Sequence, residues 1–243
     1  MSMKLVVGIP FSGRYVPPEW AMSLMHMRYP RNCRTGHYAT KGLIRDEARN
    51  KLVEKAISED SQYLLFIDDD TAPPMDMVTK LMQELDTRDE DTVVCAGIYT
   101  TKTEPYEPLV FMGHGTGPHW KWKFGDVFPC WGIATGCMMI RTSVFKRISK
   151  PWFKDIDCIE DVTEPEVFGK DGKPDVFRMT DDLYFCKKVA DAGLTILAHG
   201  GVLPVHWDQK GRGHVLPDTA YPVKDVPASE LWYKQYTVAK DQA

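Results

Sequence analysis

Three apolar runs alternate with helical patterns over the first hundred residues, and this alternation constrains the fold more than any other feature. The runs "KLVVGIP", "QYLLFI" and "TVVCAGIY" have the length and composition of buried strands. Between and after them, apolar residues recur at helical spacing in 17–27, 42–58 and 75–85. Strands that alternate with helices are typical of a mostly parallel sheet covered by helices on both faces. The sequence therefore predicts an α/β protein with a mostly parallel central sheet.

The later part of the chain predicts shorter elements. The apolar runs "VFPCWGIA" (127–134) and "GCMMIR" (136–141) are strand-like. The segment "FGKDGKPDVF" (168–177) predicts a hairpin with an Asp-Gly turn. Residues 180–193 predict a helix that has Thr180 as its N-cap.

The composition narrows the class of protein. The 243 residues, 43% hydrophobic and 26% charged, suffice for one large domain with a sizeable core, and the net charge of −4 does not suggest a nucleic-acid-binding protein. No apolar run reaches the length of a membrane span, and the first one is too short for a signal peptide, so we expect a cytoplasmic protein. The six cysteines are scattered without a C-x-x-C pair, which argues against structural zinc, a redox dithiol and a disulfide framework.

Three consecutive aspartates, Asp68, Asp69 and Asp70, directly follow the apolar run "YLLFI". In an open α/β sheet, ligands bind beyond the carboxyl ends of the strands. Because neighbouring carboxylates repel one another, we expect a cation there, and Mg²⁺ or Mn²⁺ suits carboxylate oxygens. Magnesium commonly takes part of its shell from substrate phosphates, so the pattern predicts a phosphorylated substrate. The alternative is a turn, where Asp is common.

The loop after the first strand differs from the common phosphate-binding loops. The chain contains no G-x-x-x-x-G-K-[ST] motif, and no G-x-G-x-x-G follows this strand. The loop "GIPFSGRYVPP" instead offers Pro10, Phe11, Ser12 and Arg14, which suit a base and a ribose better than a phosphate.

Four segments, in this order, resemble the GT-A-fold glycosyltransferases, closest to the family 2-like group. The first three are "VVGIPFSGR", "IRDEARNKLVEKAI" and "YLLFIDDDTAPPMDMVTKL", the last of which matches the D-x-D segment of that group. The fourth is the ordered set "ATGCMMIRTSVFKRI", "PWF", "TDDLYFCKKVADAGLTI" and "VHW". Together they span roughly residues 4–207.

The resemblance implies a single GT-A domain over 1–243, with a Rossmann-like sheet flanked by helices. Its nucleotide-binding half would be about 1–100, its acceptor-side half about 101–208 and its tail 209–243. It also implies a metal-dependent glycosyltransferase that takes a nucleotide-sugar donor, with a UDP-sugar favoured, and transfers the sugar to a hydroxyl acceptor.

The resemblance implies which residues contact the donor. Arg49 and Asn50 match the "aRN" helix ahead of the metal site, and a guanidinium can clamp a diphosphate. For Arg45, one turn earlier, a solvated helix face is the alternative. Asp68 would contact the ribose or sugar. The implied donor-binding set is Pro10, Phe11, Ser12, Arg14, Arg45, Arg49, Asn50, Asp68, Asp69 and Gly136.

The implied metal ligands are Asp70, Asp68 and His206, which would hold Mn²⁺ or Mg²⁺. Such an ion neutralises charge on the departing nucleoside diphosphate. His206 matches the late histidine of the family, although a histidine after an apolar run is also typical of a protein core.

Asp181 and Asp182 open the predicted helix 180–193 and match the acidic pair of the family, which is usually Glu-Asp. The resemblance implies that Asp182 is the general base for the acceptor hydroxyl and that Asp181 stands in place of the Glu. The alternative is that both acids only stabilise the helix start. A base here suits an inverting mechanism, but retaining relatives exist.

The acceptor stays open among a lipid-linked glycan, a polysaccharide, a protein and a modified nucleic-acid base. A glycan is favoured, and the basic stretches 26–41 and "HWKWK" keep a nucleic acid in consideration. The segment 113–126 predicts either a mobile loop over the acceptor site or a loop whose tryptophans only pack. Two other functions compete, namely a sugar-phosphate nucleotidyltransferase and a non-catalytic module that binds nucleotide sugars or polyanions. The oligomeric state is also open.

Overall fold

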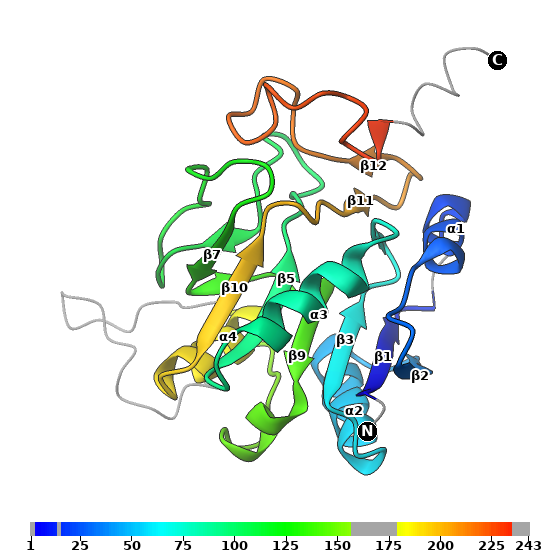
Figure 1. Cartoon of the computed structure of the whole chain (residues 1–243), viewed down its shortest axis with the longest axis vertical. Coiled ribbons are helices and arrows are strands. Elements are labelled where there is room, and N and C mark those ends of the chain that lie inside the picture. Colours follow the sequence, from blue (N-terminus) through cyan, green and yellow to red (C-terminus); the bar gives the residue numbers. More distant parts are fainter. Residues whose placement is uncertain (1–2, 14–15, 157–178, 235–243) are drawn as a thin grey trace.

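The structure is a computed structural model that describes residues 3–13, 16–156 and 179–234. Its centre is a seven-stranded sheet in the order β2-β1-β3-β9-β5-β10-β7 (Figure 1). The strands are β1 (Met3–Phe11), β2 (Cys33–Lys41), β3 (Tyr63–Ile67), β5 (Thr92–Gly97), β7 (Val127–Cys130), β9 (Cys137–Arg141) and β10 (Thr195–His199). The pairs β1–β2, β1–β3 and β5–β10 are parallel, whereas β9 runs antiparallel to β3 and β5, and β7 runs antiparallel to β10.

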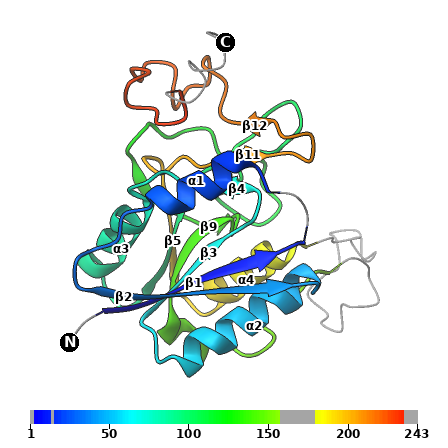
Figure 2. The same cartoon turned by 90° about the vertical axis from the view of Figure 1, so that its right-hand side faces the viewer.

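Helices cover both faces of this sheet. They are α1 (Pro18–His26), α2 (Arg45–Ser58), α3 (Met77–Thr87) and α4 (Asp181–Asp191), and a 3-10 helix spans Thr142–Lys146. Figure 2 shows α3 on one side of the sheet and α2 and α4 on the other.

Strand side chains alternate between these two layers. Leu64 and Phe66 pack into the cluster that contains α2 and α4 residues, while Leu65 and Ile67 pack into the cluster under α3. Because both faces are covered, β3 is apolar at every position, as expected for a central strand. Each fully buried Leu, Ile or Phe contributes about 1.5–3 kcal/mol.

Two small sheets lie beyond the main one. β4 (Thr71–Ala72), β11 (Val205–Trp207) and β12 (Gly213–His214) form the first, and β6 (Val110–Phe111) and β8 (Gly132–Ile133) form the second. Because β4 directly follows the three aspartates and pairs with β11, it brings His206 next to that cluster.

The α/β fold with a mostly parallel sheet, predicted from the sequence, is confirmed. Two strands depart from the simple alternation of strands and helices. β2 is a polar edge strand whose side chains mostly alternate between exposed and half-buried positions. Because its sequence is basic and has no apolar run, the sequence analysis did not predict a strand there. β9 inserts between β3 and β5 and interrupts the parallel order. Its apolar sequence predicts a buried strand but not its direction.

Some expectations fall outside the described residues, namely the hairpin at 168–177 and the donor contact of Arg14. Among the helices that the structure describes, none has the length and apolar character needed to cross a membrane.

Candidate active site

A cavity of about 830 Å³ opens at the carboxyl ends of β1 and β3, beside the first turns of α2 and α4. Parallel strands bring these ends to one edge of the sheet, which is where open α/β sheets bind ligands. The cavity gathers most of the residues predicted from the sequence: Pro10, Phe11, Ser12, Arg45, Arg49, Asp68, Asp69, Asp70, Asp181, Asp182 and His206.

The base of the cavity is an ion-pair network centred on Arg49, which is 2% exposed. Its Nη1 and Nη2 donate to both carboxylate oxygens of Asp68, at 2.9 and 3.0 Å, and its Nε donates to Asp181 Oδ2 at 2.6 Å. Burial disfavours charge on Arg49, but the two carboxylates outweigh it and raise the pKa of Arg49 well above its usual value. Arg49 therefore joins strand β3 to helix α4 as a permanent cation.

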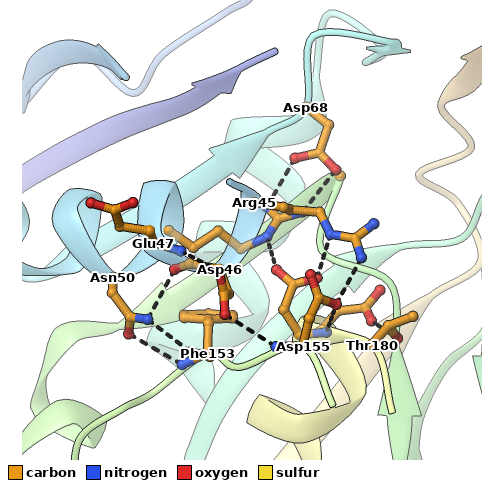
Figure 3. A network of polar contacts seen from close by, with 12 residues as sticks. Arg45, Asp46, Glu47, Asn50, Asp68, Phe153, Asp155 and Thr180 are labelled. Carbon is orange, nitrogen blue, oxygen red and sulfur yellow. Dashed lines mark hydrogen bonds and ion pairs between the residues drawn. The ribbon is translucent and has the colours of Figure 1, made fainter. Parts of the chain in front are cut away.

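Arg45 lies one helical turn before Arg49 and contacts the same carboxylate. Its Nε lies 2.7 Å from Asp181 Oδ1, and its Nη2 donates to Asp155 Oδ1 at 2.8 Å. Figure 3 shows Arg45, Asp68 and Asp155 converging in this network. Asp181, only 1% exposed, thus has a guanidinium group on each oxygen. Its geometry is that of a buried ion-pair partner.

Two residues of the implied donor set lie elsewhere. Asn50 donates to the carbonyl of Phe153 at 2.7 Å and accepts from the backbone N–H of Trp152 and of Phe153, so it fastens the "PWF" segment to α2 (Figure 3). The backbone N–H of Gly136 donates to the Tyr99 hydroxyl at 2.8 Å. A Cβ at Gly136 would lie 2.5 Å from that hydroxyl, so the close approach that the glycine permits is to Tyr99.

Asp69 links the ends of β1 and β3 at the cavity. Its Oδ2 accepts from the backbone N–H of Ser12 at 2.7 Å and from the Ser12 hydroxyl at 2.6 Å. This contact holds Ser12, directly after the last β1 residue Phe11, against the end of β3.

Asp70 faces His206 and Lys102. Lys102 Nζ lies 2.5 Å from Asp70 Oδ2, and His206 Nε2 lies 3.6 Å from Asp70 Oδ1. Burial opposes charge on the Asp70 carboxyl, but His206 and Lys102 hold its pKa well below the usual value. Asp70 is therefore ionised at neutral pH.

The orientation of His206 is fixed by its other ring nitrogen. Nδ1 lies 2.7 Å from the carbonyl oxygen of Thr100, so Nδ1 carries a proton. Nε2, the other ring nitrogen, faces Asp70 Oδ1 across 3.6 Å, which is too long for a hydrogen bond. A backbone carbonyl behind a histidine is the usual support of a metal-binding imidazole.

The cavity has a surplus of negative charge. Six aspartates line it (Asp68, Asp69, Asp70, Asp155, Asp181 and Asp182), against three basic side chains, Arg45, Arg49 and Lys102. Three uncompensated negative charges would repel a diphosphate, so an added cation is needed for such a ligand. Among the described residues, no group of three or more His, Cys, Asp or Glu could hold a metal ion by itself.

Asp182 lies across the network at the start of α4. Its Oδ1 accepts from the hydroxyl of Thr180 and from the backbone N–H of Leu183. In the part of the chain that the structure describes, no hydrogen-bond donor contacts Oδ2. Asp182 is half-buried, so this oxygen can accept a proton from a molecule in the cavity.

Sequence reasoning missed Tyr99, Lys102 and Asp155 as cavity residues. Tyr99 and Lys102 follow β5, and the rule that ligands bind at strand carboxyl ends could have identified them. Asp155 had no such signal because it follows an irregular segment. In the segment 113–126, Trp122 is 2% exposed and packs near Phe128, which fits the alternative that this tryptophan packs.

Replacing Arg49 tests the network. We expect Arg49→Met to lower the free energy of unfolding by about 3–5 kcal/mol, because it leaves Asp181 buried and short of a partner. The matched control, Arg45→Met, removes a half-exposed guanidinium from the same carboxylate and should cost less than about 1 kcal/mol. Urea denaturation of both variants measures this, and equal small losses would contradict the central role of Arg49.

Comparisons with known proteins identify the fold. Residues 39–149 match the family model for glycosyl transferase family 2, which confirms the resemblance inferred from the sequence. The structure "Crystal Structure of A197 from STIV" has a TM-score of 0.55 at 16% identity, over 93% of this chain and 100% of that chain. "Crystal structure of S. aureus TarS 1-349" has a TM-score of 0.39 at 13% identity, over 59% of this chain and 48% of that chain. Among curated protein sequences, none matches.

The chain therefore has the glycosyltransferase GT-A fold, and the family match supports a function in glycosyl transfer.

Proposed function

We propose that this protein transfers a sugar from a nucleoside-diphosphate sugar, with UDP-sugar favoured, to a hydroxyl acceptor. The observation that carries the proposal is that Asp70 and the Nε2 atom of His206 face each other in the cavity that also contains Asp182, whose Oδ2 has no donor among the described residues. This arrangement supports an ion site for the diphosphate and a base for the acceptor hydroxyl within one cavity.

The nucleoside would bind at the β1 side of the cavity. Phe11, Leu43 and Ile44 line it there, and their apolar surfaces suit a base. Ser12 is held by Asp69 at the position where the ribose would follow. Asp68 has both oxygens on Arg49, so we assign it to the sugar nucleotide rather than to the cation.

Asp70 and His206 would hold Mn²⁺ or Mg²⁺. Two protein ligands leave most of the shell to the diphosphate and water, as is common for these ions. The ion would supply charge neutralisation for the leaving nucleoside diphosphate.

Lys102 would contact the diphosphate in the loaded enzyme. In the free protein its ammonium lies on Asp70, where it competes with a divalent ion for the same carboxylate. A diphosphate offers this ammonium a second anion, so donor and ion would bind together.

This competition predicts the direction in which Lys102→Met changes the affinity for Mn²⁺. Without nucleotide, we expect the variant to bind Mn²⁺ at least about tenfold more tightly, since competition by one unit charge exceeds about 1.4 kcal/mol at an intermediate dielectric. Its affinity for the nucleoside diphosphate should fall. Titration calorimetry measures both, with Lys41→Met as the control outside the cavity lining. An unchanged or weaker Mn²⁺ affinity in Lys102→Met would refute the competition.

Asp182 would take the acceptor proton. Thr180 and the N–H of Leu183 hold Oδ1, so Oδ2 points its lone pairs at the attacking hydroxyl. A base that deprotonates the nucleophile directly suits inversion at the anomeric carbon. Asp181, paired on both oxygens, would position Arg49 and α4.

A thermal-shift screen of nucleotide sugars, with and without Mn²⁺, tests this proposal. We expect one nucleotide class to raise the melting temperature only when Mn²⁺ is present, because the ion compensates the surplus charge. If no nucleotide sugar changes the melting temperature, the proposal is wrong.

A further inference from the structure

A second cavity, of about 810 Å³, lies outside the candidate active site. It is lined by residues 104–106 of the segment after β5, by Trp120, and by residues 213–218 around and after β12. These segments gather at the end of the molecule where β11 and β12 lie (Figure 1). No role follows for it from the family match.

One segment, residues 101–106, contributes to the linings of both cavities. Thr101, Lys102 and Thr103 line the first, and Glu104 and Tyr106 line the second. This short segment is held by its own hydrogen bonds, from Thr101 N–H to the Glu107 carbonyl at 2.9 Å and from Glu107 N–H to the Thr101 hydroxyl at 3.1 Å. A chain-like molecule that occupies both cavities would therefore cross a segment that is held in place.

Aromatic rings form much of the second cavity, and one of them is held in place. The ring of Tyr106 stacks on His214, with centroids 5.1 Å apart and planes inclined by 30°. His214 in turn lies 3.1 Å from Asp208 Oδ2, which also accepts from Arg212. Tyr106 thus has a supported orientation, and Trp120 adds a larger half-buried ring. Such rings offer flat apolar faces with a polar edge.

The charged groups of this cavity select against polyanions. Its lining residues include the carboxylates of Glu104 and Asp218, and the described lining contains no Lys or Arg. Asp218 is paired with Lys234, and His214 with Asp208, so these partners add no surplus positive charge. A nucleic acid needs Lys or Arg contacts to its phosphates, which this lining lacks. Carboxylates are, however, strong acceptors for hydroxyl groups.

We propose that this second cavity is the acceptor subsite and that it binds a neutral saccharide. Tyr106 and Trp120 contact the sugar faces, and Glu104 accepts from sugar hydroxyls. The terminal hydroxyl then reaches Asp182 across the segment 101–106. This inference rests on the proposed glycosyl transfer, and it narrows the acceptor to an uncharged glycan.

The test is saturation-transfer NMR on the full chain with two probes. One is a panel of neutral trisaccharides of glucose, galactose, mannose and N-acetylglucosamine, and the other is a single-stranded DNA oligonucleotide. We expect at least one trisaccharide to bind at millimolar concentration, and Trp120→Ala to weaken it by about tenfold. Trp131→Ala, a tryptophan outside the cavity lining, is the matched control and should bind as the wild type does.

Glu104→Lys is the second variant, because Glu104 is exposed and its replacement does not disturb the core. It should weaken the trisaccharide and leave DNA unbound. The inference would be overturned if DNA bound and Glu104→Lys strengthened that binding. It would also be overturned if no trisaccharide bound, or if Trp120→Ala left saccharide affinity unchanged. Nucleotide binding with Mn²⁺ is measured separately on the wild type. If the wild type binds no nucleotide, the proposed function is wrong; if it binds nucleotide but no saccharide, only the acceptor subsite is wrong.

Discussion

Asp182→Asn should suppress sugar transfer by about 10²–10⁴-fold while leaving nucleotide affinity within about twofold of the wild type. The amide keeps the size of the side chain and can still accept the contacts that the structure gives to Oδ1. It cannot take a proton from the acceptor. Steady-state kinetics with a working acceptor, together with calorimetric titration of the nucleotide, separate these two effects.

The matched control is Asp191→Asn at the other end of α4. Asp191 is paired with Lys187 on the surface, so its replacement should change neither transfer nor nucleotide affinity. Loss of the acid at the helix start should cost only about 0.3–1 kcal/mol of stability in Asp182→Asn. Wild-type turnover in that variant would reduce Asp182 to a residue that stabilises the helix start.

Asp70→Asn should abolish the Mn²⁺ dependence of nucleotide binding and lower transfer by at least about 10²–10³-fold. Among the described residues, Asp70 is the carboxylate that faces both His206 and Lys102, so an ion held there would lose its charged ligand in this variant. Kinetics in buffered Mn²⁺ and nucleotide titration with and without Mn²⁺ measure the two effects.

Asp76→Asn is the control for this prediction, because Asp76 is a surface residue paired with Lys80 just beyond the cluster. The fold of Asp70→Asn should survive, since Asp70 is not part of the Arg49 network. Full activity of Asp70→Asn, or nucleotide binding that still responds to Mn²⁺, would remove Asp70 from the ion site.

Much of the site could be predicted because strand ends are local features. An apolar run followed by Asp68, Asp69 and Asp70 marks both a buried strand and the edge where a ligand binds. The start of α4 could be predicted in the same way, since Asp181 and Asp182 directly follow the N-cap Thr180.

The pairing of these groups could not be predicted, because it depends on contacts across the fold. Arg49 and Asp181 are 132 residues apart and meet only once α2 and α4 lie on the same face of the sheet. The sequence therefore could not show that Asp181 is a buried ion-pair partner while Asp182, one residue later, lines the cavity with an open oxygen. The polar edge strand β2 was missed for a related reason, because it buries little and carries weak periodicity.

The most direct test of glycosyl transfer is phosphorus NMR of the products formed from a panel of nucleotide sugars. With the wild-type protein, Mn²⁺ and the neutral trisaccharides as acceptors, we expect one nucleotide sugar to be converted to its nucleoside diphosphate while its sugar passes to an acceptor hydroxyl or to water, and we expect chelation of the ion to stop the conversion. A panel left intact, or cleavage to a nucleoside monophosphate and a sugar 1-phosphate, would contradict this account.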